Sequence, residues 1–124
     1  MANELILIVE DNPQSLKLVR DILQIKGYQT LETETGEEGV RLARERQPAL
    51  ILMDIQLPGI NGIEALQRLR ADPMTSATPV IAVTASVMTQ DRSRIMAAGF
   101  NGFQSKPISI KQLLTTVREI LDKP

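Results

Sequence analysis

The side chains that could do chemistry in this sequence are carboxylates, one threonine and one lysine, and each follows a short apolar run or a weaker strand candidate. These residues are Glu10 and Asp11 after the run 5–9, Asp54 after 50–53, Thr84 after 80–83 and Lys106 after 102–105. The chain has no Cys and no His, which excludes thiolate and imidazole ligands, cysteine nucleophiles and histidine bases. Oxygen ligands alone select a hard cation, and a few carboxylates together with water and phosphate oxygens favour Mg²⁺.

Each of these residues also has an ordinary structural explanation when it is taken alone. Asp11 could cap a helix, Asp54 could be a turn residue, Thr84 could be a β-branched strand residue, and Lys106 could be solvated. Taken together, three carboxylates in one pocket would repel one another unless a divalent cation and a lysine neutralised them. A free carboxylate beside Mg²⁺, a lysine and a hydroxyl suggests phosphoryl transfer onto an aspartate.

The elements that must position these residues are short strands alternating with helices. The runs 5–9, 50–53 and 80–83 are continuously apolar, which is typical of strands covered on both faces, and 28–33 and 102–105 are weaker strand candidates. Five β/α units in alternation predict an α/β fold, with a five-stranded parallel sheet and helices on both faces. Ligands of such sheets bind beyond the carboxyl ends of the strands, where the polar residues fall.

Local signals mark where several helices begin and end. The last helix is the clearest, because apolar residues recur at helical spacing over 110–121. Asn12 followed by Pro13 predicts a helix start, and Thr35 with Glu38 predicts a capping box. Gly27 and Gly99 suit the position that follows a helix.

Length and composition exclude several classes of protein. The 124 residues predict one domain, 1–124, and 43% hydrophobic with 23% charged residues argue against disorder. The formal net charge is −1, so no nucleic-acid partner is expected. The longest apolar runs, 5–9 and 49–53, are too short to span a membrane or to serve as a secretory signal. The absence of Cys fits a reducing compartment, and we expect a cytoplasmic protein.

Four segments, in order and spread over nearly the whole chain, resemble the receiver domain of two-component response regulators. They are Ile8-Val9-Glu10-Asp11-Asn12, Leu52-Met53-Asp54-Ile55-Gln56-Leu57-Pro58-Gly59, Val83-Thr84-Ala85 and Ser105-Lys106-Pro107. The resemblance implies the flavodoxin-like (βα)5 fold known as CheY-like. Stand-alone receivers of the DivK-like type are the nearest match, and receivers of hybrid histidine kinases are nearly as similar.

The resemblance also implies a role for each matching residue. Asp54 would be the phosphoacceptor. Asp11 and Asp54 would ligate Mg²⁺ or Mn²⁺ through their carboxylates and Gln56 through its backbone carbonyl. Glu10 would act through a metal-bound water. Glu10 stands where many receivers have an aspartate, and its extra methylene is a departure from the family pattern.

The remaining matches imply a phosphoryl cradle and a switch. The Thr84 hydroxyl and the backbone N–H groups of Gln56 and Ala85 would bind phosphoryl oxygens. Lys106 would pair with Asp54 before phosphorylation and with the phosphoryl group after it, and its bond to the next proline would be cis. Phe103 would be the switch aromatic, which is often tyrosine in the family; alternatively its ring is simply part of the core.

The function that the resemblance implies is phosphoacceptance in a two-component phosphorelay. A sensor histidine kinase or a histidine phosphotransfer protein would donate the phosphoryl group, and a shift in conformational population would control binding of another protein. The binding face would comprise the helix before Gly99, the strand 102–105 and the helix 110–121, with Ile95, Phe103 and Lys111 nearby. Catalysis would be limited to self-phosphorylation and dephosphorylation, in a bacterial protein that is a monomer or weak dimer.

Other classes of protein remain as alternatives. A flavin-binding electron carrier would need a phosphate loop after the first strand, where Glu10 and Asp11 would repel phosphate. An aspartate-nucleophile phosphatase would carry Asp-x-Asp there, and this chain does not. A phosphorylation-independent pseudo-receiver is disfavoured by the retained site residues. A receiver excised from a hybrid histidine kinase is a further alternative, although the Met1 start and compact end favour a free-standing protein without an output domain.

Overall fold

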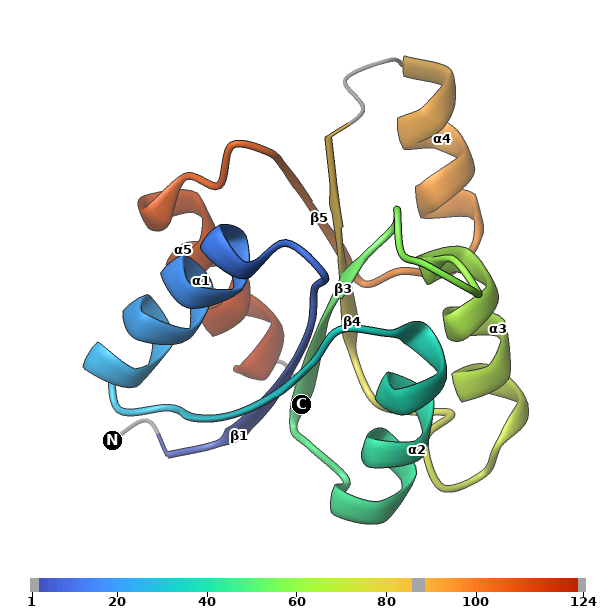
Figure 1. The fold of residues 1–124 in the computed structure, drawn as a ribbon, viewed down its shortest axis with the longest axis horizontal. Helices are drawn as coiled ribbons and strands as arrows, with labels where there is room; N and C mark the ends of the chain where they lie inside the picture. The colour runs from blue at the N-terminus through green and yellow to red at the C-terminus, as the bar shows by residue number, and fades with distance from the viewer. Residues whose placement is uncertain (1–2, 86–88, 123–124) are drawn as a thin grey trace.

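The computed structural model describes residues 3–85 and 89–122 and shows strands and helices in strict alternation (Figure 1). The strands are β1 (Leu5–Val9), β2 (Gln29–Thr33), β3 (Leu50–Asp54), β4 (Val80–Thr84) and β5 (Gly102–Ser105). The helices in the described ranges are α1 (Pro13–Ile25), α2 (Gly36–Arg46), α3 (Gly62–Ala71), α4 (Thr89–Ala97) and α5 (Ile110–Leu121). The predicted (βα)5 organisation is therefore confirmed.

The five strands form one parallel sheet in the order β2-β1-β3-β4-β5. Helices α1 and α5 cover one face, and α2, α3 and α4 cover the other (Figure 1). The strand order reverses at β1, which lies between β2 and β3, and ligands of open parallel sheets bind at such a switch point. The ends of β1 and β3 are adjacent because Val9 pairs with Met53.

The core consists of two aliphatic layers, one on each face of the sheet. β1, β3 and β4 are buried on both faces, which explains their continuous apolar runs. On the α1–α5 side, Ile6, Leu52 and Val117 belong to one buried cluster, and on the other side Met53 and Leu66 belong to the second. The sheet ends are thus rigidly placed. Among the described residues, no helix is long and apolar enough to cross a membrane.

Most of the local signals act as expected. The Asn12 side chain accepts hydrogen bonds from the N–H groups of two α1 residues, and Pro13 is the first residue of α1. The Thr35 hydroxyl accepts from the Glu38 N–H, but the Glu38 carboxylate pairs with Arg41, so one half of the predicted capping box is in place. Gly27 and Gly99 follow α1 and α4 with φ of 91° and 109°, as their predicted positions require.

Two strand boundaries differ from the prediction in a way that matters for the site. Asp54 and Thr84 are the last residues of β3 and β4, and do not follow these strands as predicted. Pairing with β4 and β5 extends to Asp54↔Val83 and Thr84↔Ser105. The ladder hydrogen bonds therefore hold the backbone at both positions, and each side chain has a defined direction.

Candidate functional site

Three carboxylates gather at the carboxyl edge of the sheet, where β1 and β3 end side by side. Glu10 and Asp11 follow β1, and Asp54 ends β3. Each contributes an oxygen, and these oxygens lie within 4.8 Å of one another. Glu10 and Asp54 are only 5% and 3% exposed, whereas Asp11 is exposed. The predicted acidic cluster is thus assembled, with one carboxylate facing solvent.

Lys106 reaches this cluster from the end of β5 and contacts two of its members. Its Nζ lies 2.9 Å from Glu10 Oε1 and 3.3 Å from Asp54 Oδ2. The other Glu10 oxygen, Oε2, accepts a hydrogen bond from the Asn12 N–H at 3.1 Å. Sequence reasoning paired Lys106 with Asp54 and missed the closer contact to Glu10, for which the extra methylene of glutamate is the only signal in the sequence.

The electrostatics of the site reflect its excess of negative charge. Burial raises the pKa of Asp54 well above its ordinary value, and the hydrogen bond and negative charge of Glu10 raise it further, while Lys106 and the Gln56 N–H act in the opposite direction. Burial lowers the pKa of Lys106, but the hydrogen bond to Glu10 and the charges of both carboxylates raise it overall. One lysine therefore balances the three carboxylates only in part.

The residues expected to form the cradle flank Asp54 on the side of β4. The Gln56 N–H donates to Asp54 Oδ1 at 3.2 Å, and Thr84 is buried one strand away. The Lys106 N–H donates to the Thr84 carbonyl at 2.8 Å, which ties the end of β5 to that of β4. Ala85 is exposed next to Thr84. The Lys106–Pro107 peptide bond is cis, as the resemblance implied.

The burial of Phe103 is intermediate between the two alternatives that the sequence left open, an exposed switch aromatic and a residue of the core. Its side chain is half-buried against the core layer of α2–α4, and the Arg92 guanidinium carbon lies 5.2 Å from the ring centroid. Lys111 is exposed, and with Phe103 it lines a shallow hollow between β5 and α5. Ile95, which was expected near the binding face, is 2% exposed and belongs to the core, so its side chain is not available at the surface.

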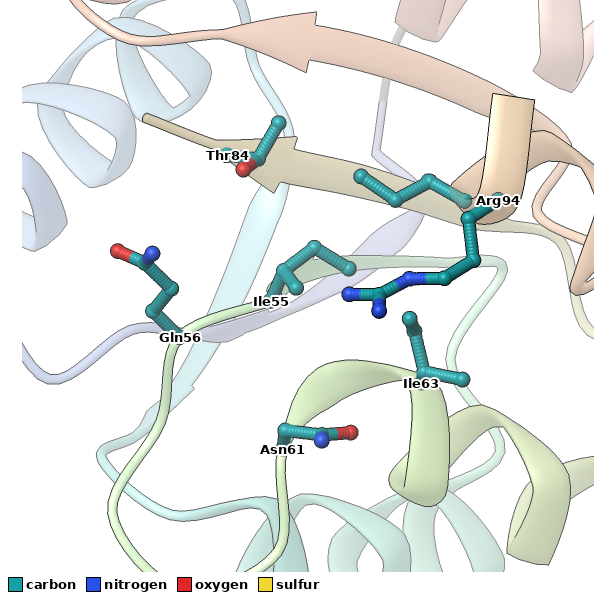
Figure 2. Close-up of a pocket in the computed structure, with 7 residues that line it drawn as sticks. Ile55, Gln56, Asn61, Ile63, Thr84 and Arg94 are labelled. Atoms are coloured by element: carbon teal, nitrogen blue, oxygen red, sulfur yellow. The ribbon is translucent and has the colours of Figure 1, made fainter. Parts of the chain in front are cut away.

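A cavity of about 210 Å³ opens on the α3–α4 side, lined by Ile55 and Gln56 just after the end of β3 (Figure 2). Its walls are residues of the β3–α3 connection, the start of α3, the end of β4 and α4, namely Ile55, Gln56, Asn61, Ile63, Thr84, Arg94 and Ile95. Gln56 thus lines the cavity and also contacts the acidic cluster through its N–H bond to Asp54, and Thr84 lines the cavity from the end of the neighbouring strand β4. Sequence reasoning missed Asn61 and Arg94 here, because neither belongs to the matching segments.

The acidic cluster fits a divalent cation. It offers carboxylate oxygens close enough to share one ion, its charge is only partly neutralised, and the absence of Cys and His leaves no softer ligand. Mg²⁺ prefers such a site because it binds through one or two carboxylates and keeps several waters. The exposed Asp11 leaves the cluster open to solvent for them.

Comparison of the sequence with known proteins supports these expectations. Residues 6–118 match the family model of the response regulator receiver domain. The polar-differentiation response regulator DivK of Brucella ovis is 45% identical over 116 residues, which cover 94% of each chain.

Solved structures with the same fold include two receiver domains of histidine kinases. One, from a sensor histidine kinase of Pseudomonas aeruginosa, has a magnesium ion coordinated in its active-site cleft; it is 31% identical with a TM-score of 0.91, over 98% of this chain and 100% of that one. The other, from a signal transduction histidine kinase of Syntrophus aciditrophicus, is 32% identical with a TM-score of 0.87, over 95% and 89% of the two chains.

Proposed function

The chain belongs to the response regulator receiver domain family, and from this premise we propose that Asp54 is its phosphoacceptor. One observation carries the assignment. Asp54 ends the central strand between the lysine and the polar groups of the cradle, with Oδ2 at Lys106 and Oδ1 at the Gln56 N–H. Glu10 is turned toward Lys106 and Asn12, and Asp11 is exposed. We propose that residues 1–124 form one receiver domain.

In the proposed reaction, an Asp54 carboxylate oxygen attacks the phosphorus of a phosphohistidine. The bond between phosphorus and the imidazole nitrogen breaks, the new P–O bond forms, and the electron pair leaves with the imidazole, which takes up a proton. The Thr84 hydroxyl and the N–H groups of Gln56 and Ala85 donate to the phosphoryl oxygens, and Lys106 shifts from Asp54 to the phosphoryl group. The chain's own contribution is therefore position and charge.

The acidic cluster would hold Mg²⁺, or Mn²⁺, in this reaction. Asp11 and Asp54 would provide carboxylate oxygens, Gln56 its backbone carbonyl, and Glu10 would act through a water. When bound, the ion supplies positive charge that offsets the carboxylates and the phosphoryl oxygens. The magnesium ion in the cleft of the Pseudomonas receiver domain supports this proposal.

The donor in this proposal is a sensor histidine kinase or a histidine phosphotransfer protein. Phosphorylation would shift the population of conformations and control binding of a protein partner to the α4–β5–α5 face, which includes Phe103 and Lys111. The place of action would be the cytoplasm. Receiver domains of histidine kinases share the fold at 31–32% identity, so the same chemistry would serve in a hybrid kinase.

The proposed function is tested by incubating the protein with a small phosphodonor and Mg²⁺ and measuring its intact mass. We expect the gain of one phosphoryl group, and no gain when a chelator removes the metal. A flavin carrier or a pseudo-receiver would show no gain under either condition. Labelling that is equally strong with the chelator would contradict the metal's role.

Asp11→Asn should weaken Mg²⁺ binding by at least about tenfold. Loss of a group that only orients a metal ligand already weakens metal affinity by about this factor, and Asp11 would be a direct carboxylate ligand. Magnesium titration followed by NMR measures the affinity, since the chain has no Trp to report by fluorescence. Asp21→Asn is the matched control: Asp21 is an exposed carboxylate that pairs with Lys17, and its loss should leave the affinity unchanged. Equal affinities for both variants would show that Asp11 is not a ligand.

Phe103→Ala should cost about 1–2 kcal/mol of unfolding free energy, less than the ~3–5 kcal/mol typical of a fully buried Phe. The reason is that the ring is only half-buried and one side of it faces Arg92. Phe100→Ala provides the comparison, because Phe100 is buried just before β5 and should show the full cost. Urea unfolding measures both. If the two costs are equal, Phe103 is a fixed core residue and its role as a switch is wrong.

A further inference from the structure

The cavity on the α3–α4 side contains a positive charge, the Arg94 guanidinium, that has no role in the proposed reaction. Arg94 projects from α4, and its guanidinium points into the cavity, while Gln56 and Thr84 lie on other walls of it (Figure 2). None of the seven described residues that line the cavity is acidic. A guanidinium in a hollow with polar and apolar walls forms a site for an anion.

Arg94 is one of four arginines for which the described side chains offer no carboxylate partner, the others being Arg46, Arg70 and Arg92. The remaining five pair with carboxylates on neighbouring elements or turns, namely Arg20, Arg41, Arg44, Arg68 and Arg118. Among the side chains that the structure describes, no carboxylate pairs with Arg94. Its side chain is long and exposed, so it can reorient toward a new negative charge at little cost.

We propose that Arg94 binds the phosphoryl group on Asp54 from the α4 side once transfer has taken place. This inference rests on the proposed function. A phosphoryl group adds about two negative charges near neutral pH, and it would extend from Asp54 past Gln56, whose N–H contacts Asp54, and Thr84, both of which line the cavity. Arginine is suited to the task because its planar guanidinium can bind two phosphoryl oxygens at once.

Before the phosphoryl group is transferred, Asp54 offers Arg94 less negative charge to bind. The Asp54 oxygens already accept from Lys106 and from the Gln56 N–H, so both oxygens of the carboxylate are engaged. Arg94 therefore contacts the phosphoryl group only in the phosphorylated state, and it is not required for the attack of Asp54 on phosphorus.

The consequence is a direct link between phosphorylation and α4. Of residues 92–97 only Ile95 is buried, so a small number of contacts holds this part of the helix. A charge-assisted contact from Arg94 to the phosphoryl group would then add substantially to the few contacts that hold this part of α4 in place. The helix would report phosphorylation through its own side chain, in addition to any signal passing through Phe103.

The test compares Arg94→Gln, Arg94→Lys and the control Arg68→Gln with the wild type. Arg68 is an exposed arginine of α3 that does not line the cavity and pairs only loosely with Glu64, so its loss removes the same charge nearby. The probe is beryllium fluoride with Mg²⁺, which mimics a phosphoryl group on a carboxylate. NMR titration gives its affinity and the amide shifts of α4, and intact mass gives the rate of phosphoryl uptake from a small donor.

We expect Arg94→Gln to take up the phosphoryl group at close to the wild-type rate but to bind beryllium fluoride about tenfold more weakly, as the loss of one charge-assisted hydrogen bond predicts. The shifts in α4 should shrink, Arg94→Lys should recover part of both effects, and Arg68→Gln should match the wild type. Melting temperatures without the probe should be equal for all variants, because both arginines are exposed.

Two results would overturn the inference while leaving the proposed function intact. One is an Arg94→Gln variant with wild-type affinity and wild-type α4 shifts. The other is a variant in which only uptake is slow, because Arg94 would then act on the donor. A wild-type protein that takes up no phosphoryl group at all would overturn the proposed function, and this inference with it.

Discussion

Asp54→Asn should abolish phosphoryl uptake and at the same time stabilise the metal-free protein. Uptake is lost because an amide is a poor nucleophile and Asp54 is the carboxylate that ends the central strand between Lys106 and the cradle. Intact mass after incubation with a small phosphodonor and Mg²⁺ measures the effect, and Asp21→Asn, an exposed carboxylate of α1, is the control. Equal labelling of Asp54→Asn and wild type would refute the assignment.

The gain in stability follows from the pKa of Asp54. Burial and the charge of Glu10 raise this pKa from 3.8 to about 7 in the folded protein, so the charged form opposes folding. The loss of folding stability caused by ionised Asp54 is absent below the pKa that Asp54 has in the unfolded chain. It grows as the pH rises from about 4 to about 7, and is complete above that range. The metal-free wild type should therefore lose stability across this window.

In Asp54→Asn this loss should be largely absent, and the variant should exceed the wild type by about 1–3 kcal/mol above the window, since each pKa unit corresponds to about 1.4 kcal/mol. Urea unfolding in the presence of a chelator, below and above the window, measures the difference. Mg²⁺ should then stabilise the wild type more than the variant, because the ion offsets the same repulsion. A variant that is less stable at both pH values would contradict the proposed repulsion.

Gly62→Ala should destabilise the protein by about 3 kcal/mol and impair phosphoryl uptake as well. Gly62 is the first residue of α3, and a Cβ there would lie 2.4 Å from the Asp54 carbonyl oxygen and 2.8 Å from Ile55 Cα. Both obstacles are backbone, and the Gly62 N–H also donates to the Ile55 carbonyl at 2.9 Å. Relief of the clash must move the segment that carries Asp54, and overpacking of this kind costs about 1–3 kcal/mol or more.

Gly39→Ala is the matched control for this prediction. Gly39 lies within α2, and a Cβ there would meet the Val9 side chain at 2.8 Å, not backbone. The gain in helix propensity of about 1 kcal/mol offsets part of the cost, and Asp54 is not displaced. Urea unfolding and phosphoryl uptake should both be closer to wild type for Gly39→Ala. If the two variants behave alike, the contact of Gly62 with the Asp54 backbone is unimportant for the site.

The sequence by itself determined the elements and the edge of the sheet at which the polar residues meet. Continuous apolar runs identified β1, β3 and β4, because burial on both faces leaves no place for alternation. Asn12 and Gly27 marked the ends of α1 through hydrogen bonds and a positive φ that depend only on neighbouring residues. The roles of individual residues came from the resemblance to a family, and they remain proposals here.

Only the tertiary structure decided which side chains touch across that edge. It brought Lys106 within reach of Glu10 as well as Asp54, placed Ile95 in the core, and set Arg94 in the cavity that Gln56 and Thr84 also line. The physical reason is that secondary structure follows from periodicity over a few residues. These contacts instead join residues far apart in sequence, and depend on strand order, helix placement and side-chain length together.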